Sequence, residues 1–193
     1  MQVGGVDGLE RNGKEAKMGN GRTAKRCELL LRLLALALTL VAAILVGVDK
    51  QSAIVPIELV ASLPPLNVPV SAKWHYLSAF VYLMVTNIIA CSYAALSMLL
   101  TFTSTGENII LGSMILVLDT LMVALLFSGT GAATAIGLIG YHGNSHLRWG
   151  KVCYVFGKFC GQVAASIVVS VIGAVAFILL VVFSALRLHE KSK

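Results

Sequence analysis

Four apolar blocks constrain this chain more than any other feature of its sequence. Each is close to the ~20 residues that an α-helix needs to cross a bilayer. The blocks cover residues 29–48, 77–99, 109–128 and 161–183. The chain is 58% hydrophobic and 12% charged, which is about half the charge of a typical soluble domain. We therefore predict an all-α membrane protein, a bundle of four transmembrane helices that occupies residues 29–186.

The segments outside the blocks predict its orientation, because Lys and Arg near the membrane favour the cytosolic side. Nine Lys and Arg residues lie on the side of the two tails: Arg11, Lys14, Lys17, Arg22, Lys25, Arg26, Arg187, Lys191 and Lys193. Five lie on the other side: Lys50, Lys73, Arg148, Lys151 and Lys158. We expect both termini in the cytosol, with residues 1–28 forming a disordered basic tail and residues 187–193 a short second one. The net charge of +6 comes with no folded basic domain, so nucleic acid is not an expected partner.

A carboxylate interrupts the third block, in "ILVLDTLMVALLF". Asp119 lies about ten residues into the predicted span, close to the midplane at ~1.5 Å per residue. A charge there costs at least ~2.5 kcal/mol, so the side chain is expected to face protein, find partners or be protonated. Counted in the same way, Asn87 and Ser170 reach a similar depth, which predicts one polar layer across the bundle.

Arg32 is the second charge inside a predicted span, about three residues from its cytosolic end. An ion pair with Asp119 is one interpretation, although the expected depths differ by about 10 Å. Snorkelling of Arg32 to the interface is the other. For Asp119 itself we favour a structural or assembly role. The alternative is a small-molecule transporter or channel subunit that uses this carboxylate. The spans contain no second carboxylate and no proline, whereas many transporters have broken helices and several ionisable groups.

The fourth block carries small residues at helical spacing. Ser166, Ser170 and Ala174 form one stripe, and Gly161 and Ala165 another. Such stripes let helices approach closely. They fit lateral dimerisation and internal packing of the bundle equally well.

Cysteines and histidines gather in the loop between the third and fourth blocks. Cys153 and Cys160 lie on the predicted outer side, where a disulfide is favoured over two free thiols. His142 and His146 are four residues apart without an evident third ligand, so we predict no metal site. The sequence contains no motif for a nucleophile, a phosphate loop or paired catalytic carboxylates. We therefore expect neither an enzyme nor a cofactor.

Three segments together resemble one family of plant membrane proteins. They are "RCELLLRLLALALTLVAAILVGVDKQ" with Arg32, "LDTLMVALLFSGTGAA" with Asp119, and "WGKVCYVFGKFC" with Cys153 and Cys160. The chain resembles the Casparian strip membrane protein-like (CASP-like) family over about residues 23–190, its group 1 members most closely, and through it the MARVEL four-span group. In this family an arginine in the first span, an aspartate in the third and a cysteine pair in the second outer loop recur.

The resemblance implies a multi-pass plasma-membrane scaffold. Its best-known members form immobile patches, assemble as homo- and hetero-oligomers, and recruit enzymes that modify the cell wall. The implied partners are therefore other copies of the same chain, related CASP-like proteins, the lipid bilayer and wall-modifying enzymes. The first outer loop reads "VPIELVASLPPLNVPVSAKWHY" and lacks the aromatic cluster of the strip-forming members. A role in the Casparian strip itself is therefore less strongly implied than a scaffold role.

Overall fold

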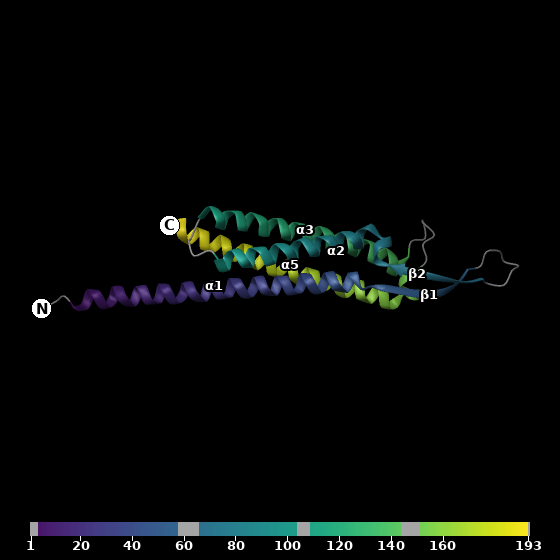
Figure 1. Ribbon diagram of the computed structural model, residues 1–193, viewed down its shortest axis with the longest axis horizontal. Coiled ribbons are helices and arrows are strands. Elements are labelled where there is room, and N and C mark those ends of the chain that lie inside the picture. The colour runs from purple at the N-terminus through teal and green to yellow at the C-terminus, as the bar shows by residue number, and fades with distance from the viewer. Residues whose placement is uncertain (1–3, 58–65, 104–108, 144–150, 193) are drawn as a thin grey trace.

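The computed structural model describes residues 4–57, 66–103, 109–143 and 151–192, and shows an elongated helical bundle with a β-hairpin at one end (Figure 1). Both chain termini lie at the opposite end, which we call the terminal end; the other is the hairpin end. The elements are α1 (Gly4–Gly47), β1 (Lys50–Ile57), β2 (Leu66–Lys73), η1 (Trp74–Tyr76), α2 (Ser78–Thr103), α3 (Ile109–His142), α4 (Val152–Val155) and α5 (Gly157–Ser192).

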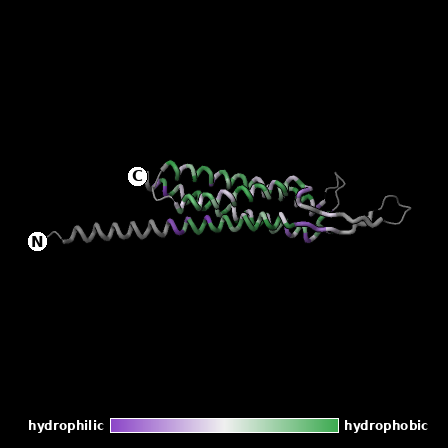
Figure 2. The backbone as a smooth tube through the Cα atoms, viewed as in Figure 1, coloured by the Kyte–Doolittle hydropathy of each residue, from purple (hydrophilic) through white to green (hydrophobic). Residues whose placement is uncertain are grey.

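Four helices are long and apolar enough to cross a membrane, which confirms the predicted class of fold. Their apolar segments are Lys25–Gly47, Ser78–Thr103, Ile110–His142 and Gly157–His189. Figure 2 shows the hydrophobic colour running along all four. Among these apolar segments, the largest departure from the expected boundaries is in α3, which continues to His142 instead of ending near residue 128. The continuation, "SGTGAATAIGLIGYH", holds no proline that would end the helix.

The first helix also differs from the expectation. It begins at Gly4, where the sequence predicted a disordered tail over residues 1–28. Extending a helix that a span has already nucleated adds one hydrogen bond per residue fixed. The segment "LERNGKEAKM" is rich in residues with good helix propensity. Both effects favour helix here despite the low hydrophobicity.

The four long helices form a closed ring. Helix α1 packs against α2 and α5, and α3 packs against the same two helices. Hence α1 lies diagonally across the bundle from α3, and α2 lies diagonally across from α5. Large apolar side chains remain exposed on the outside of every helix, such as Leu40, Leu96, Val117 and Val168. An apolar exterior of this kind is what a lipid-facing surface requires.

The interior contains two apolar clusters. The one nearer the terminal end includes Met122, Leu126, Phe177 and Leu180, with alanines of α1, α2 and α5 between them. The one at the hairpin end includes Val46, Phe80, Leu83, Phe156 and Phe159. Residues 153–160, which run from α4 into the first turn of α5, therefore contribute aromatic side chains to the core.

The hairpin was not predicted from sequence. Strands β1 and β2 are antiparallel, with a register running from Lys50 opposite Lys73 to Ile57 opposite Leu66. Pro56 lies within β1 and Pro69 within β2. Proline lacks the N–H of a ladder hydrogen bond and is tolerated only where that position faces outward. In a two-stranded sheet both strands are edges, so both prolines can be accommodated.

Candidate functional site: a buried ion network

Arg32 and Asp119 form a buried ion pair across the α1–α3 diagonal. The guanidinium Nη1 donates to Asp119 Oδ1 and Nη2 donates to Oδ2, both at 3.4 Å. Both side chains are 0% exposed. This two-point arrangement matches the planar fork of arginine to the two oxygens of a carboxylate. Of the two interpretations left open by the sequence, the structure has the ion pair and not the snorkelling arginine.

The bounds of the two apolar segments explain why the two charges meet. The sequence argument placed Asp119 at mid-depth because it ended the third span near residue 128. In the structure α3 extends to His142, so Asp119 lies much nearer the terminal end of the helix than the hairpin end. Arg32 likewise lies nearer the terminal end of the apolar segment of α1, Lys25–Gly47. The expected gap of about 10 Å came from starting the first apolar block at residue 29, whereas the apolar segment of α1 starts at Lys25.

Helix α2 completes the contacts of this pair. The Tyr93 hydroxyl lies 2.8 Å from Asp119 Oδ1, to which it donates, and 3.1 Å from the carbonyl oxygen of Ile115. Arg32 Nη1 also donates to Ser97 Oγ at 2.9 Å. Each oxygen of the carboxylate is therefore engaged. Only the Nε of Arg32 lacks a hydrogen-bond partner within the group.

Two further charges extend the group towards the terminal end. Arg32 Nη2 donates to Glu28 Oε1 at 3.3 Å, and Arg187 of α5 pairs with Glu28 Oε2. Glu28 is 7% exposed. The chain of contacts Asp119–Arg32–Glu28–Arg187 thus joins α1, α3 and α5, and its formal charges cancel. We call these four residues with Tyr93 and Ser97 the ion network.

Sequence reasoning missed Glu28, Arg187, Tyr93 and Ser97. A signal existed for Glu28, because it precedes Arg32 by four residues and such pairs share a helix face. Arg187 was counted only as a tail charge that sets orientation. Nothing local to Tyr93 or Ser97 distinguishes them from other polar residues in a span.

Asn87 and Ser170 do not join Asp119 in one layer, as the sequence had suggested. Ser170 Oγ donates to Asn87 Oδ1 at 3.1 Å, across the α2–α5 diagonal. Asn87 Nδ2 donates to the Leu83 carbonyl of its own helix at 2.8 Å. Asn87 precedes Tyr93 by six residues on α2, which is about 9 Å along a helix. The polar groups therefore form two levels, and the Asn87 level lies nearer the hairpin end.

The two small-residue stripes of α5 have different surroundings. Ser166, Ser170 and Ala174 are each 0% exposed, and Ser166 Oγ donates to the Ala42 carbonyl of α1 at 2.9 Å. This stripe packs inside the bundle. Ala165 is exposed, and a Cβ added at Gly161 would meet nothing within 4 Å. The second stripe therefore faces outward.

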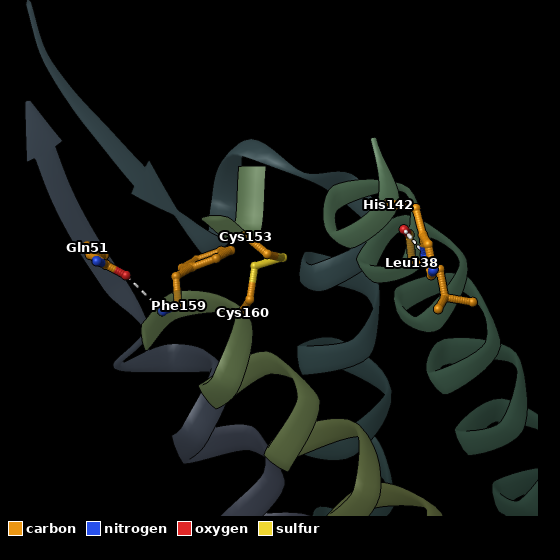
Figure 3. Close-up of a disulfide and its surroundings, with 6 residues drawn as sticks. All are labelled: Gln51, Leu138, His142, Cys153, Phe159 and Cys160. Carbon is orange, nitrogen blue, oxygen red and sulfur yellow. Dashed lines mark hydrogen bonds between the residues drawn. A yellow bond between two sulfur atoms is a disulfide. The ribbon is translucent and has the colours of Figure 1, made fainter. Parts of the chain in front are cut away.

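A disulfide joins Cys153 to Cys160 beside the N-terminus of α5, as Figure 3 shows. Next to it, the Phe159 amide donates to Gln51 Oε1 of β1 at 2.9 Å, which ties the hairpin to α5. The ring of His142 contacts the Leu138 carbonyl of its own helix, and His146 lies outside the described residues. Within the described ranges, no group of three or more His, Cys, Asp or Glu side chains could hold a metal ion.

Chemically, the ion network is suited to holding helices and not to reacting. Its carboxylates are paired with guanidinium groups, and a tyrosine and a serine fill the remaining contacts at the pair. Removing one member of a buried pair leaves an uncompensated charge, at a cost of ~3–5 kcal/mol. The network therefore favours one relative arrangement of α1, α3 and α5.

Comparisons with known proteins agree with this architecture. Residues 21–176 match the family model described as the Casparian strip membrane protein domain. The chain is 63% identical over 166 residues to CASP-like protein 1E1 of Glycine max, covering 86% of this chain and 88% of the relative. It is 60% identical over 188 residues to CASP-like protein 1E1 of Populus trichocarpa, covering 97% and 94%. It is 52% identical over 184 residues to CASP-like protein 1E1 of Arabidopsis thaliana, covering 95% of each.

No solved structure matches the chain. The family model covers most of the membrane bundle, including both residues of the Arg32–Asp119 pair. The relatives extend the likeness over nearly the whole length. The chain therefore belongs to the Casparian strip membrane protein family, among its CASP-like group 1 proteins.

Proposed function

We propose that this protein is a non-enzymatic scaffold of the plasma membrane. In this proposal the four-helix unit assembles laterally with copies of itself and with related CASP-like proteins. Both termini face the cytosol, and the hairpin and the disulfide loop face outward, where they meet proteins that modify the cell wall. The excess of Lys and Arg on the tails supports this orientation.

The observation that carries the proposal is the pairing of Asp119 with Arg32 inside the bundle. Asp119 is 0% exposed, and both its oxygens accept hydrogen bonds from Arg32. A group held in this way fixes the arrangement of helices, so that each copy presents the same outer surface to its neighbours. That a buried polar group contributes specificity in this way is a hypothesis for this protein.

The outer surface of α3 offers a candidate face for assembly. A shallow groove there is lined by Ile110, Ser113, Met114, Val117 and Leu118. The groove lies on the same helix as Asp119 and close to it in sequence. A change in the ion network would therefore displace this face directly.

Transport through Asp119 is the competing function, and the geometry favours it less. A proton or ion site must exchange with water on both sides, in alternation or through a pore. Intramembrane carboxylates that do so usually line a cavity together with other ionisable groups. Here the carboxylate lies among Arg32, Tyr93 and apolar side chains without exposed surface.

Photobleaching recovery of a fluorescent fusion in the plant plasma membrane tests the proposal. The variants are wild type, Asp119→Asn, and Thr120→Val as a matched control, because Thr120 adjoins Asp119 but is exposed and bonds only within its own helix. We expect slow recovery for wild type and Thr120→Val, and faster recovery for Asp119→Asn that still reaches the surface. Fast recovery of wild type would contradict a stable scaffold. A solute flux lost in Asp119→Asn with mobility unchanged would favour transport.

A further inference from the structure

A second buried carboxylate lies at the hairpin end, far from the ion network. Asp49 follows α1 and directly precedes β1, and it is 0% exposed. Neither of its carboxylate oxygens has a hydrogen-bond partner among the described residues. It lies beyond the apolar segment Lys25–Gly47. A buried ionised carboxylate without a partner is strongly unfavourable, so its presence requires an explanation.

The surroundings of Asp49 favour its neutral form. The backbone N–H of Asp49 donates to the Val46 carbonyl at 3.1 Å, which holds the residue against the end of α1. The carbonyl end of a helix carries a partial negative charge and disfavours an anion. Val46 itself belongs to the apolar cluster that includes Phe80 and Phe159. Burial raises the pKa of Asp49 to about 6.

Among the side chains that the structure describes, no charged neighbour compensates the carboxylate. The elements that meet at this junction carry Lys50 on β1, Lys73 on β2, His75 on η1 and Lys158 on α5. Lys50, His75 and Lys158 are exposed, and the side chain of Lys73 lies outside the described residues. The first turn of α2 has no acidic residue and the last turn of α1 no basic one. Protonation is therefore the simplest way for Asp49 to remain buried.

Asp49 also adjoins the contact that docks the hairpin on the bundle. Two residues further on, Gln51 accepts a hydrogen bond from the Phe159 amide. Phe159 in turn precedes Cys160 of the disulfide. Figure 3 shows Gln51 on the strand facing Phe159, with the disulfide on the other side of Phe159. Movement of Asp49 towards water would therefore pull directly on this contact.

We propose that Asp49 is a proton-operated latch at the root of the hairpin. With its proton the carboxyl group stays buried, and β1 remains docked on α5 through Gln51 and Phe159. Without its proton the carboxylate draws water into the junction and loosens this docking. The latch would let the pH on the hairpin side set how firmly the hairpin is held, independently of the scaffold proposal.

The direction of the effect follows from proton linkage. The pKa of Asp49 is about 6 in the docked state, against the ordinary value of 3.8 expected when the side chain is solvated. The docked state therefore binds more protons between these two values. Docking is strongest below pH 4, weakens as the pH rises through about 6, and changes little above that. The upper limit is about tenfold in the docking equilibrium for each unit of pKa difference.

The test uses the full chain in lipid nanodiscs between pH 4.5 and 8. One readout is hydrogen exchange of the Phe159 amide, and the other is the rate at which a water-soluble phosphine reduces the Cys153–Cys160 disulfide. Each wild-type rate is divided by that of Asp49→Asn at the same pH, which cancels the intrinsic pH dependence of both reactions. We expect the ratio to rise about tenfold or more with a midpoint near pH 6. The controls His75→Gln and Lys158→Gln should keep this midpoint.

Either of two results would overturn the latch: a ratio independent of pH, or a midpoint that disappears in His75→Gln.

If Asp49→Asn does not fold, the carboxyl group can be followed directly in wild type. The chain has three aspartates, Asp7, Asp49 and Asp119, so selective ¹³C labelling of aspartate gives few signals. Asp7→Asn and Asp119→Asn would identify the other two. A midpoint near 6 for Asp49 supports the proposal, and one near the ordinary 3.8 refutes it.

Discussion

The two diagonals of the bundle are held by different chemistry. Across the α1–α3 diagonal, Arg32 and Asp119 form a charged pair with two contacts of 3.4 Å. Across the α2–α5 diagonal, Ser170 and Asn87 form one neutral hydrogen bond of 3.1 Å. Neutral bonds between transmembrane helices contribute ~0.6–2 kcal/mol, whereas breaking a buried charge pair costs ~3–5 kcal/mol. The comparison indicates that the charged diagonal decides the arrangement and the neutral one adjusts it.

The largest effect is expected from breaking the charged diagonal on one side. Asp119→Asn or Arg32→Met leaves one unbalanced charge in the interior, so each should lower the free energy of unfolding by about 3–5 kcal/mol. Reversible unfolding in mixed micelles measures this change. A loss below 1 kcal/mol in both variants would remove the distinction between the two diagonals.

A smaller loss is expected from the tyrosine that supports the charged diagonal. Tyr93→Phe removes the hydroxyl that donates to Asp119 at 2.8 Å, and hydrogen bonds to charged groups contribute about 1.5–3 kcal/mol. The ring remains and still packs against Phe177. The matched control is Tyr82→Phe, whose hydroxyl contacts only Ser128 at an exposed site, and it should change the same unfolding free energy very little.

The α2–α3 contact beside the neutral diagonal can be tested by overpacking. A Cβ added at Gly129 would lie 2.5 Å from the Thr86 hydroxyl oxygen. Gly129→Ala should therefore cost about 1–3 kcal/mol, despite the higher helix propensity of alanine. Thr86→Ala in the same chain should recover most of this loss, because it removes the clashing atoms. Gly131→Ala, which meets nothing within 4 Å, is the control that should not destabilise.

The smallest effect is expected at the neutral diagonal itself. Ser170→Ala removes the bond to Asn87 but leaves Asn87 bonded to Leu83 of its own helix. The free energy of unfolding should fall by about 0.6–1.7 kcal/mol. If Ser170→Ala costs as much as Asp119→Asn in the same micelles, the neutral diagonal is not secondary.

The four helices could be predicted from sequence because an apolar stretch of bilayer length leaves few alternatives. Their ends could not, and the errors in the first and third spans carried over to the site. Hydropathy does not mark where a helix of Gly, Ala and Ile ends, so Asp119 was placed at the middle of its helix. Hydropathy also missed the charged first turn of the apolar segment of α1, so Arg32 was placed too near its end. The hairpin escaped prediction because Pro56 and Pro69 lie within its strands, and proline normally argues against a strand.

The candidate site, too, could be predicted only in part. Arg32, Asp119, Asn87 and Ser170 stand out because polar residues in apolar spans are costly. Their partners depend on the ring order of the helices, which short loops alone do not fix. Arg187 meets Glu28 from the far end of the chain, and Asp49 looks like an ordinary interfacial residue until its burial is seen.

A double-mutant cycle between Arg32 and Asp119 tests the central claim most directly. The variants are Arg32→Met, Asp119→Leu and the double substitution, each unfolded reversibly in the same mixed micelles. The double variant keeps the balanced Glu28–Arg187 pair, and replacing a whole buried pair with apolar residues is often close to neutral. We predict that each single variant loses about 3–5 kcal/mol and that the double variant regains at least about 2 kcal/mol of this loss. Losses that simply add would mean that the two charges do not hold the helices through each other, and would contradict the account.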